Sequence, residues 1–186
     1  MNTSRMMGFS IVELLITLAI LGLSVTLIAP SMQSFVTRNK VSTHINQLVK
    51  IIHMARESAI YKNKTVILCR SRSGIDCDGD WHEGILLFTD ANRDKRRNSN
   101  EEIIHHLPGF INDDRLYWRA FRNRQYLEMS PRGFTAWQNG TFTYCPVEGI
   151  EYARGIILNA AGRIRLTQDS NNDGIHEGTN GRALRC

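Results

Sequence analysis

Two short segments place carboxylate and amide side chains at alternating positions, an arrangement that could hold a calcium ion. They are Asp90-x-Asn92-x-Asp94 and Asp169-x-Asn171-x-Asp173. Calcium loops present oxygen ligands in this way. The first segment has Lys95 where such a loop needs a turn glycine, whereas the second has Gly174 there and Glu177 further on, but no closing acid at the twelfth position. Because Asp and Asn also form ordinary turns, the sequence predicts at most weak Ca²⁺ binding at the second segment and no other cofactor.

Arginines in two regions could bind phosphate. Arg163 and Arg165 are two residues apart, so on an extended strand they share one face. Arg182 near the C-terminus could join them. Residues 115–126, RLYWRAFRNRQY, interleave arginines with aromatic residues, as nucleic-acid-binding surfaces do. The same pattern fits strands that bury the aromatic residues and expose the arginines. The net charge of +5 is modest beside 18 acidic residues, so DNA binding is an alternative hypothesis.

The histidines form no catalytic pattern in the sequence. His105 and His106 are adjacent, and on a strand they would face opposite sides. A zinc site of Cys69, Cys77 and His82 would lack the paired Cys-x-x-Cys spacing. We therefore expect a protein that is not an enzyme and holds no confident metal site.

Four cysteines, at positions 69, 77, 145 and 186, can form disulfides in three ways. Cys69 and Cys77 are the natural local pair, because they enclose a short loop rich in Ser, Gly and Asp. Cys145 and Cys186 would then tie the last residue back to a strand. The sequence favours this pairing but leaves the connectivity open.

The elements that position these residues begin with a long apolar run. Residues 1–8 form a short leader that ends at Gly8, and Phe9–Ala29 follows with one charge, Glu13. About 20 apolar residues can cross a bilayer as a helix, in which a carboxylate is costly. Pro30 predicts a kink. Residues 30–61 then continue as an amphipathic helix, so that one long helix extends from Phe9 to about Tyr61.

The apolar stripe of that second half recurs at helical spacing, at Val41, Ile45, Leu48, Ile52, Ala55 and Ala59. Residues 62–186 read as one β domain, and the stripe predicts the face that packs on it. The fold class is therefore α+β, a lollipop in which the helix packs on antiparallel sheet. The expected strands are Thr65–Cys69, Gly84–Thr89, Glu102–His106, Leu116–Ala120, Leu127–Met129, Thr141–Tyr144, Gly155–Leu158 and Ile164–Thr167.

The leader and the apolar run together resemble the class III signal of type IV pilins and type II secretion pseudopilins. In that family the mature chain starts with a Phe after a Gly, and its fifth residue is Glu, as Gly8, Phe9 and Glu13 would provide. The resemblance implies that a prepilin peptidase cuts after Gly8 and methylates Phe9. It also implies that Glu13 sets register against neighbouring subunits. The chain would be a single-pass inner-membrane protein with a periplasmic domain before assembly, and would lie in the pilus fibre or at its tip after assembly.

The middle of the chain resembles the GspH/FimT/FimU group of minor pilins, and FimU-type members most. The matching features in residues 66–104 are a Cys-bearing loop, Trp-x-x-Gly and the turn F-x-D-x-N-x-D, and EYARGIILNAAGRIRL adds a second match. The resemblance implies a low-abundance structural pilin that helps prime fibre assembly, with other pilins as partners. Gly162-Arg163-Ile164-Arg165 is similar to an element used for DNA binding by FimT-type members. A DNA-binding pilin for transformation and a GspH-like pseudopilin of type II secretion are the two alternatives.

Overall fold

A single long helix, α1 (Ile11–Lys62), opens the fold of the computed structural model. The structure describes residues 10–110 and 113–186, without the side chains of residues 27–31. Contacts divide the chain into two compact units, Met1–Asn39 and Lys40–Cys186, so α1 contributes to both.

The start of α1 is capped by its own sequence. The Ser10 hydroxyl accepts a hydrogen bond from the Val12 N–H at 3.3 Å, and Glu13 lies in the first turn. A serine cap followed three residues later by an acid is the pattern of a capping box, and the helix dipole favours an acid there. The large apolar residues from Ile11 to Val25 are each more than half exposed. This part of α1 therefore has no apolar partner within the described chain.

No helix in the described part of the chain combines the length and apolar character needed to cross a membrane. The assignment of residues 9–29 as a membrane-spanning segment stays a prediction, and so does the kink at Pro30, whose side chain is not described. Gly8 and Phe9, the expected cleavage and methylation site, lie outside the described residues. The predicted helix from Phe9 to Tyr61 is confirmed over its described length.

The second unit contains two antiparallel four-stranded sheets. The first has the strand order β3-β2-β1-β5 and the second the order β4-β6-β7-β8. Their bounds are β1 Thr65–Arg70, β2 Gly84–Asp90, β3 Ile103–Pro108, β4 Arg115–Ala120, β5 Tyr126–Met129, β6 Gly140–Cys145, β7 Arg154–Leu158 and β8 Ile164–Leu166. All eight expected strands are present, with ends that differ by at most two residues.

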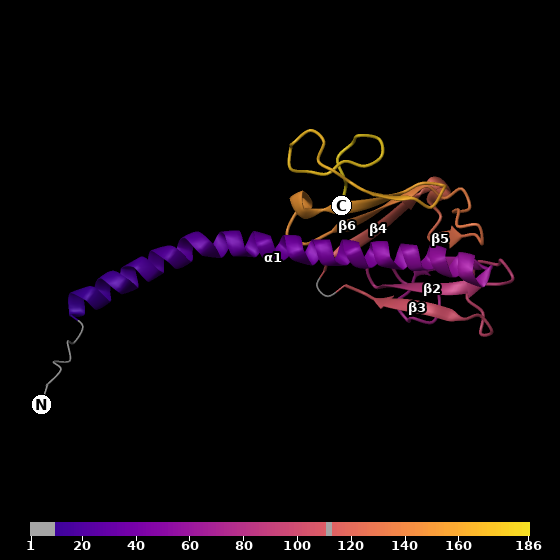
Figure 1. The fold of residues 1–186 in the computed structure, drawn as a ribbon, viewed down its shortest axis with the longest axis horizontal. Coiled ribbons are helices and arrows are strands. Elements are labelled where there is room, and N and C mark those ends of the chain that lie inside the picture. Colours follow the sequence, from indigo (N-terminus) through magenta and orange to yellow (C-terminus); the bar gives the residue numbers. More distant parts are fainter. Residues whose placement is uncertain (1–9, 111–112) are drawn as a thin grey trace, which may run out of the picture. The chain divides into compact units, whose positions relative to one another are not determined.

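The core of this unit lies where the C-terminal half of α1 meets both sheets (Figure 1). Leu48, Ile52 and Ala59 of the predicted stripe are buried there. The first sheet contributes alternate residues such as Leu68, and the second contributes Phe142. Because side chains on a strand alternate between faces, every second residue of β4, β6 and β7 points away from α1.

Candidate functional site

Two disulfides join the cysteine pairs that the sequence favoured. Cys69 bonds to Cys77 across eight positions, and Cys145 bonds to Cys186 across 41. The second bond fixes the last residue to the end of β6. It therefore determines where the C-terminal tail, residues 178–186, lies on the protein.

The C-terminal tail is also held by backbone pairing. Glu177 forms isolated β-bridges to Gln168 on one side and to Ala183 on the other. The Leu184 N–H donates a 2.8 Å hydrogen bond to the carbonyl of His176, and the Leu184 side chain is buried. The tail is thus an ordered part of the domain.

One row of side chains crosses the second sheet on its outer face, the face turned away from α1. Arg119 of β4 is opposite Thr141 of β6, Thr141 is opposite Ile157 of β7, and Ile157 is opposite Arg165 of β8. Neighbouring strands are about 4.8 Å apart, so the two arginines stand about 14 Å apart at the ends of the row.

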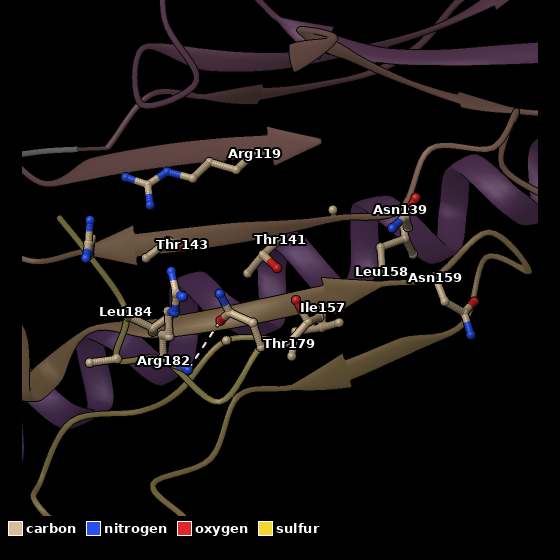
Figure 2. A pocket seen from close by; sticks show the side chains of 15 residues that line it. Arg119, Asn139, Thr141, Thr143, Ile157, Leu158, Asn159, Thr179, Arg182 and Leu184 are labelled. Carbon is tan, nitrogen blue, oxygen red and sulfur yellow. Dashed lines mark hydrogen bonds between the residues drawn. The ribbon is translucent and has the colours of Figure 1, made fainter. Parts of the chain in front are cut away.

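A groove of about 510 Å³ lies between this row and the C-terminal tail. We call it the basic groove. Figure 2 shows Arg119, Thr141 and Thr143 from two strands and Arg182 from the tail around it. Its lining residues are Arg119, Asn139, Gly140, Thr141, Thr143, Ile157, Leu158, Asn159, Gly178, Thr179, Asn180, Arg182, Ala183, Leu184 and Arg185.

The arginines of this region carry uncompensated charge. Within the described part of the chain, no carboxylate lies within ion-pairing distance of Arg119, Arg165 or Arg182. Arg165 lines a smaller pocket that shares Ile157 with the basic groove. Arg163 is exposed and lines neither pocket. The structure thus brings Arg165 and Arg182 to one region and adds Arg119, which comes from the second candidate segment, residues 115–126.

The largest aromatic residue of segment 115–126, Trp118, lies in the core and not beside the arginines. Trp118 is 3% exposed and stacks on Phe142 with ring centroids 4.1 Å apart. Leu116 is buried beside it, while Arg115 and Arg119 face solvent. The alternating-strand interpretation holds for Leu116 and Trp118, but Tyr117 and Phe121 are 37% and 57% exposed, and Arg122 lies 5.4 Å from the centre of the Phe121 ring. Trp118 is therefore not available to stack on nucleic-acid bases.

The second acidic segment gathers its carboxylates, as a metal loop would. One carboxylate oxygen from each of Asp169, Asp173 and Glu177 lies within 4.8 Å of the others. The Ile175 N–H and then the Asn171 side chain donate hydrogen bonds that lower the pKa of Asp173. Asn171 also accepts from the Asp173 N–H, which folds the loop back on itself.

A buried polar network fastens α1 to the second sheet. Tyr144 donates a 2.6 Å hydrogen bond to Asp114, and Lys40 of α1 lies 3.2 Å from the same carboxylate and 2.7 Å from Glu148. Burial opposes ionisation of Asp114, but the donors Tyr144, Val147 N–H and Lys40 outweigh it and lower its pKa. Burial and the Asp114 charge raise the pKa of Tyr144. The network is structural and orients the helix on the sheet.

The chain is similar to known proteins in both sequence and structure. Residues 44–162 match the family described as type II transport protein GspH. Two crystal forms of the type IV minor pilin FimU of Pseudomonas aeruginosa are similar in structure, with TM-scores of 0.51 and 0.55 at 18% identity. The matches cover 68% and 72% of this chain and 92% of each FimU chain. No curated protein matches the sequence. Since the family match spans more than half of the sequence, the chain belongs to the GspH family, and its fold is the α+β pilin fold of FimU.

Proposed function

We propose that this chain is a minor structural pilin of a type IV pilus, incorporated at low abundance and helping to prime fibre assembly. The observation that carries the proposal is the unpartnered half of α1. Its large apolar residues from Ile11 to Val25 are each more than half exposed, and water does not favour such a surface. Lipid before assembly, and the helices of other pilins after it, would cover these residues. Before assembly the protein would be anchored in the inner membrane through these residues, with the compact unit Lys40–Cys186 in the periplasm.

In this proposal the N-terminal residues are first processed and then used in assembly. Prepilin peptidase would remove residues 1–8 after Gly8 and methylate Phe9. Glu13 would then pair with the terminal amine of a neighbouring subunit and fix the register of the helices. An ion pair in an apolar bundle needs both partners, because a lone buried charge is costly. The role of the chain is packing, and we propose no catalytic step.

The test replaces Glu13 by Gln, which keeps its size and removes its charge. We expect the leader to be cleaved normally while recovery of the subunit in sheared fibres falls at least about tenfold, the equivalent of 1.4 kcal/mol. Glu57→Gln, an exposed acid on the same helix, is the matched control and should assemble normally. Normal incorporation of Glu13→Gln would refute the register role, and loss of cleavage would assign Glu13 to processing instead.

The family description supports a second candidate, a minor pseudopilin of type II secretion. Deleting the gene and scoring twitching, exoprotein secretion and transformation separates the candidates. A pilus subunit should affect twitching and leave secretion intact, and a pseudopilin should do the reverse. Complementation with the unaltered gene must restore whichever phenotype is lost.

The three arginines at the basic groove and its neighbouring pocket support a third candidate, a DNA-binding pilin for natural transformation. Arg119, Arg165 and Arg182 would contact phosphates without reading bases. For the full-length protein in detergent, we expect Arg165→Ala with Arg182→Ala to weaken duplex binding and lower the salt slope by about two. Arg72→Ala with Arg132→Ala removes equal charge elsewhere and is the control. Equal weakening by both pairs, or no binding at low salt, would refute this candidate.

A further inference from the structure

The loop of residues 168–177 closes on itself just before the C-terminal tail. The Glu177 N–H donates a 2.9 Å hydrogen bond to the carbonyl of Gln168, so the ends of the loop meet. Inside it, Asp169 accepts from the Gly174 N–H at 2.9 Å, and Asp173 accepts from the Ile175 N–H at 2.8 Å. Gly174 has a φ of +87°, a conformation that L side chains rarely adopt. The carboxylates of Asp169 and Asp173 are therefore held by backbone N–H groups of their own loop.

Two carboxylate oxygens in this loop are buried without a hydrogen-bond donor. Glu177 is 8% exposed, and its Oε2 accepts from the Ser170 N–H at 2.7 Å while its Oε1 has no partner. Oδ1 of Asp169 is also buried and unpartnered. A buried carboxylate oxygen without a donor is unfavourable. A cation bound among the three acids would satisfy both oxygens and remove the repulsion between the carboxylates.

The loop after β2 provides an internal comparison, because it has the same local hydrogen bonds. Asp90 accepts from the N–H five residues later, and Asp94 accepts from the N–H two residues later, as Asp169 and Asp173 do. Its closing acid differs. Both oxygens of Glu101 accept backbone hydrogen bonds, from Ala91 and Asn98, so Glu101 has no oxygen left without a donor. Asp90 does have one buried unpartnered oxygen, but the acids of this loop do not gather as the later three do.

We propose that Asp169, Asn171, Asp173 and Glu177 form a Ca²⁺ site. The ligands offered are all oxygens, and three of the four residues are acids, which suits a hard cation. His176 is not among the gathered ligands, and its Nδ1 lies 2.8 Å from the carbonyl of Thr167. Backbone carbonyls and water would complete the coordination.

Calcium bound at this position would hold the C-terminal tail in place. Glu177 is both a proposed ligand and the residue that bridges to Ala183. Gly178, which follows it, lines the basic groove together with Arg182. An ion that fixes Glu177 would therefore also fix one wall of the groove. This inference does not depend on the proposed function, since it concerns binding by the isolated protein.

The test uses full-length protein in detergent, stripped with a chelator and titrated with CaCl₂ or MgCl₂ by calorimetry and thermal melting. We expect Ca²⁺ to bind with a Kd near or below about 1 mM, as extracellular calcium modules do, and to raise Tm. Mg²⁺ should bind at least about tenfold more weakly, because it demands a stricter octahedral geometry.

Two variants make the assignment falsifiable. Asp173 is exposed, so Asp173→Asn should fold normally and lose the Ca²⁺-dependent rise in Tm. Asp94→Asn, its counterpart in the earlier loop, should keep that rise. Failure of the unaltered protein to bind Ca²⁺ at 5 mM (about five times the expected Kd), equal binding of Mg²⁺, or loss of the response in Asp94→Asn alone would each overturn the proposal.

Discussion

The two disulfides should stabilise the fold to different degrees, and the structure allows the difference to be calculated. In the chain-entropy treatment, a cross-link reduces the entropy of the unfolded state by an amount that grows with the logarithm of the loop it closes. The sequence separations are eight for Cys69–Cys77 and 41 for Cys145–Cys186. These give about 2.5 kcal/mol for the short loop and about 4 kcal/mol for the long one.

The two pairs are matched in other respects. Each joins one buried cysteine, Cys69 or Cys145, to one exposed cysteine, Cys77 or Cys186. The packing lost on replacement by Ala is therefore similar for both pairs. The expected difference of about 1.5 kcal/mol then reflects loop length.

The assay is urea unfolding of the full-length protein in detergent, comparing the Cys69→Ala/Cys77→Ala variant with the Cys145→Ala/Cys186→Ala variant. We expect the second to unfold at the lower urea concentration, with an m-value somewhat above that of the unaltered protein, because the unfolded chain expands when the cross-link is lost. Equal midpoints, or a larger loss from the short loop, would refute the loop-length reasoning. A second early transition in the Cys145→Ala/Cys186→Ala variant would show instead that the tail unfolds by itself.

Two further predictions concern the interior of the second unit. Because the pKa of Asp114 is lowered in the folded state, its contribution to stability is present above the ordinary Asp value of about 4 and is lost as pH falls through the lower folded value. Asp114→Asn should therefore be less stable at pH 7 and show a flatter acid-unfolding profile by circular dichroism. The control Asp113→Asn changes an exposed residue and should match the unaltered protein. Identical profiles for all three proteins would contradict the role of the network. Ile52 is 1% exposed, so Ile52→Ala should lower the free energy of unfolding in urea by about 2–5 kcal/mol. Ile60 is 50% exposed, so Ile60→Ala should lower it much less. Similar losses for the two variants would contradict the packing of α1.

The regular elements followed from local patterns, and the basic groove did not. Helical spacing from Val41 to Ala59 and short β-like runs give α1 and the strands, because periodicity reports which side is buried. The groove depends on the strand order β4-β6-β7-β8, which places Arg119 in one row with Arg165. That order involves residues far apart in the chain, and no local spacing encodes it.

The roles of Glu177 and Ser10 are compatible with the sequence but do not follow from the motifs that predicted the site residues. The twelfth position of a calcium loop starting at Asp169 is Asn180, whereas the fold closes the loop earlier through the bridge between Gln168 and Glu177. The capping pattern from Ser10 to Glu13 was also visible. It gives Glu13 a local stabilising role at the helix start, in addition to the register role that remains a prediction.

The bond between Cys145 and Cys186 also affects how the protein responds to mechanical load. A chain pulled between α1 and its last residue transmits force through this covalent link to β6. The two cysteines are 41 positions apart. The segment between them then carries no tension, and about 140 Å of possible extension, at about 3.4 Å per residue, does not occur. The acidic loop and the basic groove's tail wall both lie within that shielded segment. The covalent link spares both of them direct tension while the chain before Cys145 is loaded.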